Sequence, residues 1–454
     1  MPYIPHTEQD KQEMLAQIGI DSIDALFSEI PKNLQISGLK NIPEGITESE
    51  VTRLINERAA KDHVNLNFIG AGAYEHHIPA VVTDIISRGE FLTAYTPYQA
   101  EASQGTLQVI YEYQSMMCHL MQMDVSNASM YDGASALAES ILMAIRLHKN
   151  AKAKTILLPH TLHPAYRRVI QTVTKTHNLE LVIIPYDAHA GHITLDALKP
   201  YTGKDVAALV ISQPNFFGIL EDVDELTNWA HQNGILVIAN VNPMAMALLK
   251  APGSWGEKGA DIAAGEGQPL GAPLSCGGPY FGYLCTKKEH VRQLPGRIVG
   301  RTIDKDGKTG FVLTLQAREQ HIRRAKATSN ICSNQALLAT GATIYMSLLG
   351  AEGMRRIAAT SNANANLLYE KLLKIKGVEA IFNRPFFHEF VVRFHKPVAE
   401  ILHNLASNGI QGGFDLTFEY PMLGNSLLIC TTETKSTEDL ELYVHQLEKI
   451  LNAG

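Results

Sequence analysis

The chain has 454 residues and a formal net charge of −7, and at this length we expect more than one domain. The acidic balance gives no electrostatic reason to expect nucleic acid or an anionic membrane as a partner. No apolar run approaches the roughly 20 residues that span a bilayer. The five cysteines show no C-x-x-C spacing, and the first residues lack the basic and apolar stretches of a secretory signal. We therefore expect a cytoplasmic protein without disulfides.

Residues 1–65 are polar and helix-prone. Thr7 with Asp10 three residues later, and Thr47 with Glu50 three residues later, indicate two helix starts. The segment has too few apolar positions to form a core of its own. We expect an N-terminal arm that lies over the main domain or over a neighbouring subunit.

Strands and helices alternate through much of residues 66–330. Apolar runs typical of strands occur at 155–159, 179–186, 206–212 and 235–240, with helical patterns near 165–176 and 222–232. This alternation is typical of a mostly parallel sheet covered by helices. We expect a large α/β domain here, closed by a hairpin that turns on Asp306-Gly307.

Residues 331–454 have a different pattern. A long helical region runs from Asn334 to Lys376, is interrupted at Gly350 and ends at Gly377. Short strands and two helices follow it. We expect a helical linker and a small C-terminal α+β domain.

The stretch from Gly234 to Pro273 contains two buried strands and a turn rich in glycine and proline. An arm, a large sheet domain and a small C-terminal domain, in this order, match the layout of fold-type-I pyridoxal-phosphate (PLP) enzymes, the PLP-dependent transferase-like fold. In such enzymes an Asp at the end of the first strand holds the pyridinium nitrogen, and a Lys after the second strand forms the Schiff base.

This chain lacks both groups. The first strand ends in Asn240, the turn carries Gln268-Pro269, and no lysine lies between Asp261 and Leu284. The sequence predicts a site with the layout of a PLP site and without its reactive amine.

Four segments carry a resemblance to a known family. They are TAYTPYQAEASQGTLQ (93–108), MYDGASALAES (130–140), PGRIVGRTID (295–304) and REQHIRRAKATSNICSNQALLA (318–339). With them the chain resembles the glycine cleavage system P-protein over nearly its whole length. The resemblance is closer to the separate first, or alpha, subunit found where that enzyme is split into two chains.

The resemblance implies an αβ or (αβ)₂ complex in which the beta subunit carries the Schiff-base lysine and PLP. Together the subunits would decarboxylate glycine and transfer the aminomethyl group to the lipoyl arm of the H-protein. A non-catalytic scaffold or regulator that stabilises the beta subunit remains an alternative. So does a free-standing PLP enzyme in which Lys287 or Lys288 serves as the reactive lysine.

The aromatic segment offers candidates for a contribution to the partner's site. Tyr95, Tyr98, Ser103 and Gln104 place hydroxyl and amide groups around a proline and a glycine. Loops from this region of fold-type-I dimers commonly cross the interface into the partner's site. We expect these residues to reach the partner's site, and a locally satisfied turn is the alternative.

Gly133 and Ser135 stand at a predicted helix start, where free N–H groups could hold a phosphate. Without the lysine, we expect a vestigial, empty cradle or an ordinary N-cap. His160 follows a strand where fold-type-I enzymes place the ring that stacks on the cofactor. With His163 it could also form an H-x-x-H metal pair, but no third ligand is evident and we expect no metal.

The basic cluster formed by Arg318, His321, Arg323, Arg324 and Lys326 fits either an acidic partner or a solvated helix face.

Overall fold

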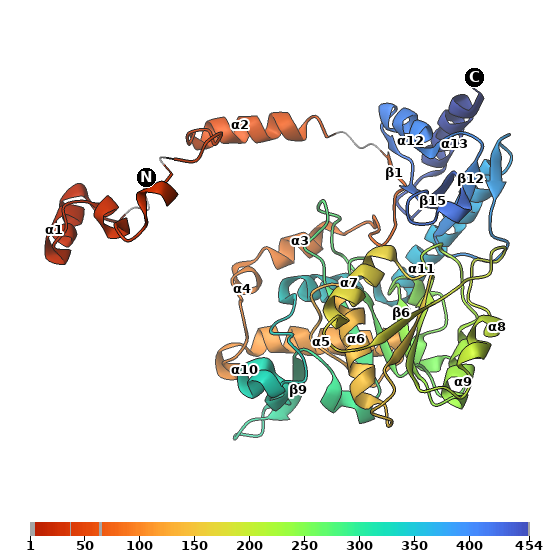
Figure 1. Ribbon diagram of the computed structural model, residues 1–454, viewed down its shortest axis with the longest axis horizontal. Helices are drawn as coiled ribbons and strands as arrows, with labels where there is room; N and C mark the ends of the chain where they lie inside the picture. Colours follow the sequence, from red (N-terminus) through yellow and green to blue (C-terminus); the bar gives the residue numbers. More distant parts are fainter. Residues whose placement is uncertain (1–4, 37, 63–65, 453–454) are drawn as a thin grey trace. The chain divides into compact units, whose positions relative to one another are not determined.

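The structure is a computed structural model that describes residues 5–36, 38–62 and 66–452. The chain forms two compact units, Met1–His63 and Val64–Gly454. The second unit contains the sheets and the cores, and the first is built from short helices (Figure 1).

The first unit contains two α-helices, α1 (Glu8–Ile18) and α2 (Glu48–Ala59). Both predicted capping boxes are present, because Thr7 and Thr47 each exchange hydrogen bonds with an acidic residue three positions later. Two 3₁₀ turns, Ile23–Phe27 and Lys32–Leu34, lie between the helices. None of these four elements has a buried residue.

A seven-stranded sheet forms the centre of the second unit, with strand order β2-β8-β7-β6-β5-β3-β4. Strands β3 to β7 run parallel, while β8 is antiparallel to both β7 and β2. The strands span Val125–Ser126 (β2), Thr155–Pro159 (β3), Glu180–Ile184 (β4), Val206–Gln213 (β5), Leu236–Val241 (β6), Ile262–Glu266 (β7) and Gly282–Thr286 (β8). The prediction of a mostly parallel sheet is confirmed.

Both faces of this sheet are covered, so its strands are apolar on both sides. On one face, Ile156, Val210 and Ile238 pack against α6 (Gly133–Leu147) and α7 (Pro164–Thr174). On the other, Leu157 and Val237 pack in a second core with α5, α9 and α11. The remaining helices of this unit before α11 are α3 (Ala80–Ile86), α4 (Gly89–Leu92), α5 (Gln104–Met121), α8 (Leu195–Leu198), α9 (Val223–Gln232) and α10 (Gln320–Arg323).

The predicted hairpin is present as β9 (Ile298–Ile303) and β10 (Thr309–Thr314). Asp304 closes its turn by accepting the backbone N–H groups of Asp306 and Lys308.

The C-terminal part holds a four-stranded antiparallel sheet covered by α12 and α13 (Figure 1). Its core includes Phe390, Leu427 and Tyr443. The elements are β11 (Val378–Ala380), β12 (Glu389–Phe394), α12 (Val398–Ser407), β14 (Phe414–Asp415), β15 (Ser426–Cys430) and α13 (Thr437–Asn452), and a separate pair joins β1 (Leu66–Asn67) to β13 (Ile410–Gln411).

Helix α11 (Ala336–Leu372) connects the two sheets, and its backbone breaks at Gly350, as predicted, where φ is 59°. Residues such as Tyr345 and Ala358 pack in the core of the large sheet, whereas Leu368 and Leu372 pack in the C-terminal core. None of the helices in the described part of the chain is both long and apolar enough to cross a membrane.

Candidate active site

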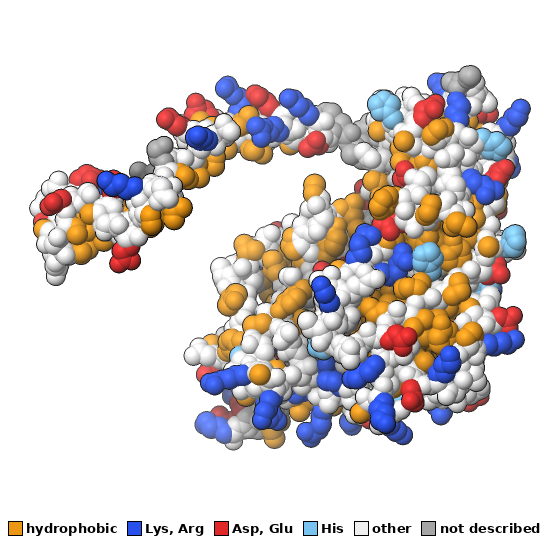
Figure 2. Space-filling view, viewed as in Figure 1, with side chains coloured by type: hydrophobic (Ala, Val, Ile, Leu, Met, Phe, Trp, Pro, Cys, Tyr) orange, Lys and Arg blue, Asp and Glu red, His pale blue; other side chains and the backbone are white. Residues whose placement is uncertain are grey.

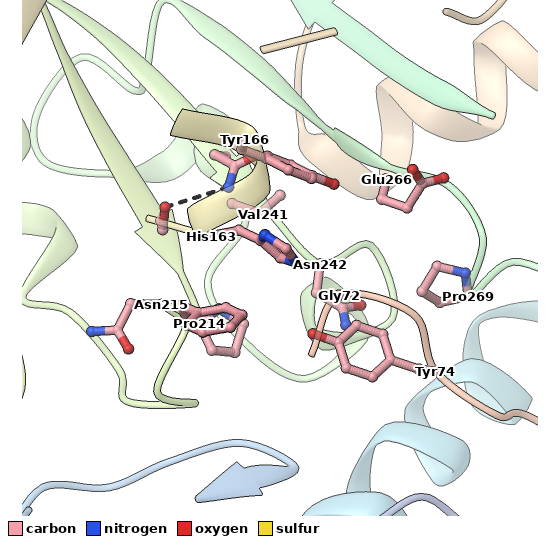
Figure 3. Close-up of a pocket in the computed structure, with 13 residues that line it drawn as sticks. Gly72, Tyr74, His163, Tyr166, Pro214, Asn215, Val241, Asn242, Glu266 and Pro269 are labelled. Atoms are coloured by element: carbon pink, nitrogen blue, oxygen red, sulfur yellow. Dashed lines mark hydrogen bonds between the residues drawn. The ribbon is translucent and has the colours of Figure 1, made fainter. Parts of the chain in front are cut away.

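A small pocket lies where β5, β6 and β7 end, at the carboxyl edge of the parallel strands. Ligands of open α/β sheets bind at this edge. Its walls come from the strand ends, from the start of α7 and from the segment around Gly72. They comprise Gly72, Tyr74, His163, Tyr166, Ser212, Pro214, Asn215, Phe216, Asn240, Val241, Asn242, Glu266 and Pro269 (Figure 3). The cavity measures about 70 Å³.

The N-terminus of α6 is occupied by side chains of the chain itself. The carboxylate of Glu266, the last residue of β7, accepts a hydrogen bond from the backbone N–H of Gly133 at 2.9 Å. Asp132 is the N-cap and accepts the N–H of Ser135 at 2.7 Å, while the Ser135 hydroxyl lies 3.2 Å from the N–H of Asp132. Of the two alternatives for this turn, the geometry favours the N-cap, with Asp132 as the capping residue and Glu266 bound to the N–H of Gly133.

The approach between α6 and β7 is close enough to require glycine. A Cβ atom at Gly133 would lie 2.6 Å from the backbone nitrogen of Glu266 and close to the Tyr166 hydroxyl. Burial raises the pKa of Glu266 to about 7, and the charge of Asp132 acts in the same direction. The hydrogen bond from Gly133 opposes this shift. Figure 3 shows Tyr166 directed toward Glu266 from the start of α7.

Gln268 follows β7 at the position where a PLP enzyme of this fold would carry its Schiff-base lysine. Its side chain is buried, with 2% exposed. Its side-chain oxygen accepts the N–H of Tyr74 at 2.8 Å, and its amide donates to the carbonyl of Tyr74 at 2.8 Å. The same amide nitrogen also donates to the carbonyl of Ala272. Gln268 thus fixes the segment around Tyr74 against the turn that follows β7.

A second buried carboxyl holds the same segment from the C-terminal sheet. Glu389 accepts the N–H of Ala71 at 2.7 Å and the hydroxyl of Tyr74 at 2.8 Å. Burial raises the pKa of Glu389 to about 7. Tyr74 is therefore held at its backbone by Gln268 and at its hydroxyl by Glu389, and its ring forms one wall of the pocket.

His163, and not His160, lines the pocket. His163 Nε2 lies 2.8 Å from the carbonyl of Ala71 and Nδ1 accepts the N–H of Ala165, so both ring nitrogens are used and the ring is neutral. Burial lowers its pKa further. The ring of His160 stacks on Tyr186 instead, at 5.8 Å between centroids. Among the described residues no group of three or more His, Cys, Asp or Glu side chains is placed to hold a metal ion.

Lys287 lies at the opposite edge of the sheet from the pocket. Its Nζ is 2.6 Å from Asp261, which also lies 2.9 Å from His231 Nε2. Burial opposes ionisation of Asp261, but the hydrogen bonds from His231 and Lys287 hold its pKa at about 2. Thr286 pairs with Ile262, the first residue of β7, whereas Glu266 is the last, a separation of roughly 13 Å at 3.3 Å per residue. Lys287 is therefore far from the pocket, and Lys288, the next residue, lies at the same edge of the sheet, where its N–H donates to Asp124.

These residues do not fit PLP. The pocket has no lysine, and Asn240 replaces the carboxylate that would hold the pyridinium nitrogen. The Asn240 amide donates to Ser212 at 3.3 Å instead. Glu266 accepts the N–H of Gly133 at the N-terminus of α6, the helix start at which a phosphate cradle was expected.

The four residues predicted to reach a partner's site differ in how they are held. Tyr95 is 91% exposed. The hydroxyl of Tyr98 accepts a hydrogen bond from Arg297 at 3.0 Å, and the guanidinium lies over its ring. The Gln104 amide is used within the chain, because it bonds the N–H and the carbonyl of Phe311 and the carbonyl of Ala100. Ser103 precedes α5 without a side-chain capping bond.

Three residues of the basic cluster, Arg318, Arg323 and Lys326, line a surface hollow of about 340 Å³ together with Arg292, whereas His321 and Arg324 do not line it. Arg318 is structural, because its guanidinium donates to the carbonyls of Leu294, Gly296 and Leu315. Arg323 donates to the carbonyl of Ala317.

Glu266, Tyr74 and Glu389 were missed by the sequence analysis. For Glu266 a signal existed, because a carboxylate flanked by Gly265 and Gly267 directly follows a predicted buried strand. Tyr74 and Glu389 carried no such local signal.

Comparison with known proteins gives the family. The family model described as "Glycine cleavage system P-protein" matches residues 1–447. This chain belongs to the P-protein family. A relative from Nitrosospira multiformis, "Probable glycine dehydrogenase (decarboxylating) subunit 1", is 59% identical over 451 residues, covering 99% of each chain. A relative of the same description from Legionella pneumophila is 57% identical over 452 residues, covering 100% of this chain and 99% of the relative.

Solved structures agree with this assignment. A crystal structure of glycine decarboxylase (P-protein) of the glycine cleavage system, in inhibitor-bound form, superposes with a TM-score of 0.89 at 40% identity. The match covers 99% of this P-protein chain and 100% of the other. Glutamate decarboxylase from Lactobacillus brevis matches at a TM-score of 0.69 with 12% identity, covering 93% and 97% of the two chains. At that identity it supports the fold alone, and the predicted fold-type-I architecture is confirmed.

Proposed function

We propose that this chain is the cofactor-free subunit of a two-chain glycine dehydrogenase (decarboxylating), in which the beta subunit carries PLP and the Schiff-base lysine. The observation that carries the proposal is that this P-protein chain, matched over its whole length, has neither the lysine nor the aspartate that would bind the cofactor in its own site. Gln268 and Asn240 stand where a PLP enzyme of this fold would carry its lysine and its aspartate, and Glu266 accepts the N–H of Gly133 at the N-terminus of α6. A glycine dehydrogenase built on this chain needs its cofactor elsewhere.

On the partner, PLP would supply the electron sink that accepts the electron pair left when glycine loses its carboxylate as CO₂. The aminomethyl group would then pass to the lipoyl arm of the H-protein. The part of this chain is to complete the cleft of the partner and to exclude water from it. Tyr95 is suited to such a contact because its side chain is 91% exposed and carries a hydroxyl that can donate to a carboxylate without the fixed charge of an arginine.

The N-terminal unit, taken by itself, supports the proposal of a partner, because its own residues do not cover its apolar side chains. Among the described residues of this unit, fourteen large apolar side chains are left exposed by the rest of the unit, and none of the residues in its helices is buried (Figure 2). They are Met14, Ile18, Ile23, Leu26, Phe27, Ile30, Leu34, Ile36, Leu39, Ile42, Ile46, Val51, Leu54 and Ile55. Interfaces of permanent complexes are this apolar, and they bury on the order of 2,000–5,000 Å². We assign residues 1–65 as an arm that packs on the partner.

Glycine–CO₂ exchange tests the proposal. The chain is expressed alone, together with a lysine-bearing P-protein homologue from the same source, and with that homologue after its lysine is replaced. We expect exchange only from the intact pair. Exchange by this chain alone, or a borohydride-reducible adduct on one of its lysines, would contradict the proposal.

A scaffold that stabilises the beta subunit without touching substrate is the second candidate. Two of the predicted contact groups favour it, because the Gln104 amide and the Tyr98 hydroxyl already have partners within the chain. The two candidates differ in whether the Tyr95 hydroxyl contacts substrate in the partner's site.

A further inference from the structure

The site differs from a PLP site in more than the missing lysine. A helix N-terminus with free N–H groups favours an anion, and α6 has fifteen residues and begins at the carboxyl edge of the sheet. Here the anion is part of the protein. Glu266 accepts the N–H of Gly133 with one carboxylate oxygen, and the other lies 3.2 Å from the N–H of Gln268.

Two glycines that flank the site have close neighbours. A Cβ at Gly133 would meet the Glu266 backbone at 2.6 Å, and one at Gly72 would meet the His163 ring at 2.7 Å. The segment around Gly72 is held in place by the hydrogen bonds from Gln268 and Glu389. The N–H of Gly133 at the N-terminus of α6 is therefore bound by Glu266 and not free for a phosphate.

We propose that Glu266 replaces a cofactor phosphate at the N-terminus of α6, so that restoring lysine at position 268 does not by itself allow this chain to bind PLP. The inference rests on the geometry of this chain and does not depend on the proposed partnership.

The chemistry of a lysine at position 268 explains the expected failure. A Schiff base forms when a neutral amine attacks the aldehyde carbon of PLP, the new C=N bond replaces C=O, and the oxygen leaves as water. In the Gln268→Lys variant, the side chain would lie beside the buried carboxyl of Glu266, and a neighbouring ammonium group favours the ionised form of that carboxyl. A nearby carboxylate stabilises the ammonium form, which is not a nucleophile. The same carboxylate would repel the phosphate that must anchor the cofactor.

The experiment compares Gln268→Lys, Glu266→Ala and the double variant in the full-length chain, alone and in complex with its partner. Each is incubated with PLP and reduced with borohydride, and peptide mass spectrometry quantifies the adduct at position 268. Because the readout is assigned to one peptide, cofactor bound to the partner does not interfere. We expect background labelling in Gln268→Lys and an increase of about tenfold or more in the double variant, since a like charge has left the phosphate position.

Further variants separate the roles of volume and charge. Glu266→Gln with Gln268→Lys removes the charge and keeps the bulk, and we expect labelling below that of the Glu266→Ala double variant. Adding Asn240→Asp to the double variant should raise labelling again, because it restores a carboxylate for the pyridinium nitrogen.

A second measurement does not need the lysine. Inorganic phosphate should raise the melting temperature of Glu266→Ala and leave that of the wild-type chain unchanged, with chloride at equal ionic strength as the control. Full labelling of Gln268→Lys alone would overturn the proposal. So would a folded double variant that neither labels nor responds to phosphate, because something other than Glu266 would then close the site.

Discussion

The side-chain amide of Gln268 pairs with both backbone polar groups of Tyr74, accepting its N–H and donating to its carbonyl, each at 2.8 Å. These residues are 194 positions apart in the chain. An amide can make this two-way contact because it carries a donor and an acceptor, whereas a lysine offers donors alone. The residue at the lysine position therefore has a structural role of its own.

We expect Gln268→Ala to destabilise the chain. It leaves the N–H and the carbonyl of Tyr74 without partners in a part-buried site. Each buried polar group left unpaired typically costs about 1–3 kcal/mol of unfolding free energy. Urea unfolding of the purified chain measures the loss, and hydrogen exchange should show faster exchange around Tyr74. Gln232→Ala is the matched control, because Gln232 is exposed. Equal stability of the two variants would show that the contact contributes nothing.

The buried carboxyl of Glu389 predicts a pH dependence of stability. Its pKa is raised by burial from the ordinary 4.5 to about 7, so the folded chain holds a proton that the unfolded chain has released. Its stabilising contribution is complete below about 4.5 and is lost as the pH rises through about 7. The difference is on the order of 3 kcal/mol. Glu266, with a pKa of about 7, acts in the same direction.

Unfolding free energies measured between acid and neutral pH test this prediction. We expect Glu389→Gln to flatten the decline, because the amide cannot ionise and still carries groups for Ala71 and Tyr74. Glu448→Gln, on the exposed side of α13, should leave the decline as it is. A wild-type chain that gains stability across this pH range would contradict the direction of the shift.

The apolar side of α2 predicts a loss of assembly. Val51, Leu54 and Ile55 stand three and four positions apart, so they share one face of the helix, and each is between 38% and 53% exposed. Replacing all three by serine should weaken binding to the beta subunit while the melting temperature of the chain alone stays unchanged, because none of them belongs to its cores. Deletion of residues 1–45 should have a larger effect in the same direction.

Sedimentation of equimolar mixtures measures this assembly. The matched control places serine at Arg53, Asn56 and Glu57 in the same helix. If both triple variants assemble like the wild-type chain, the arm does not pack on the partner through α2. Without the partner, we expect self-association of the wild-type chain through the same face.

Tyr95 separates the two candidate functions. If its hydroxyl donates to the substrate in the partner's site, Tyr95→Phe should lower glycine turnover by roughly 5- to 150-fold, the equivalent of a hydrogen bond of about 1–3 kcal/mol made in the transition state. Assembly should be unaffected. Tyr201→Phe removes a hydroxyl from a distant 3₁₀ turn and serves as the control. A Tyr95→Phe complex with wild-type rates of exchange and aminomethyl transfer would favour the scaffold.

Local patterns in the sequence predicted the elements of the fold well. The strand expected at 235–240 is β6 at Leu236–Val241, and the helix break at Gly350 is present. These features depend on residues close in the chain, through periodicity and backbone freedom. The contacts that hold the site together depend on residues far apart in the chain. Gly133 and Glu266 are 133 positions apart, and nothing local marks one as the partner of the other.

The sharing of α11 between two cores has a thermodynamic consequence. One helix supplies residues to both cores, with Tyr345 and Ala358 in the large one and Leu368 and Leu372 in the C-terminal one. Melting of either core would remove packing partners from the other. Residues 66–452 should therefore denature in a single cooperative transition with one calorimetric peak, although they contain two sheets.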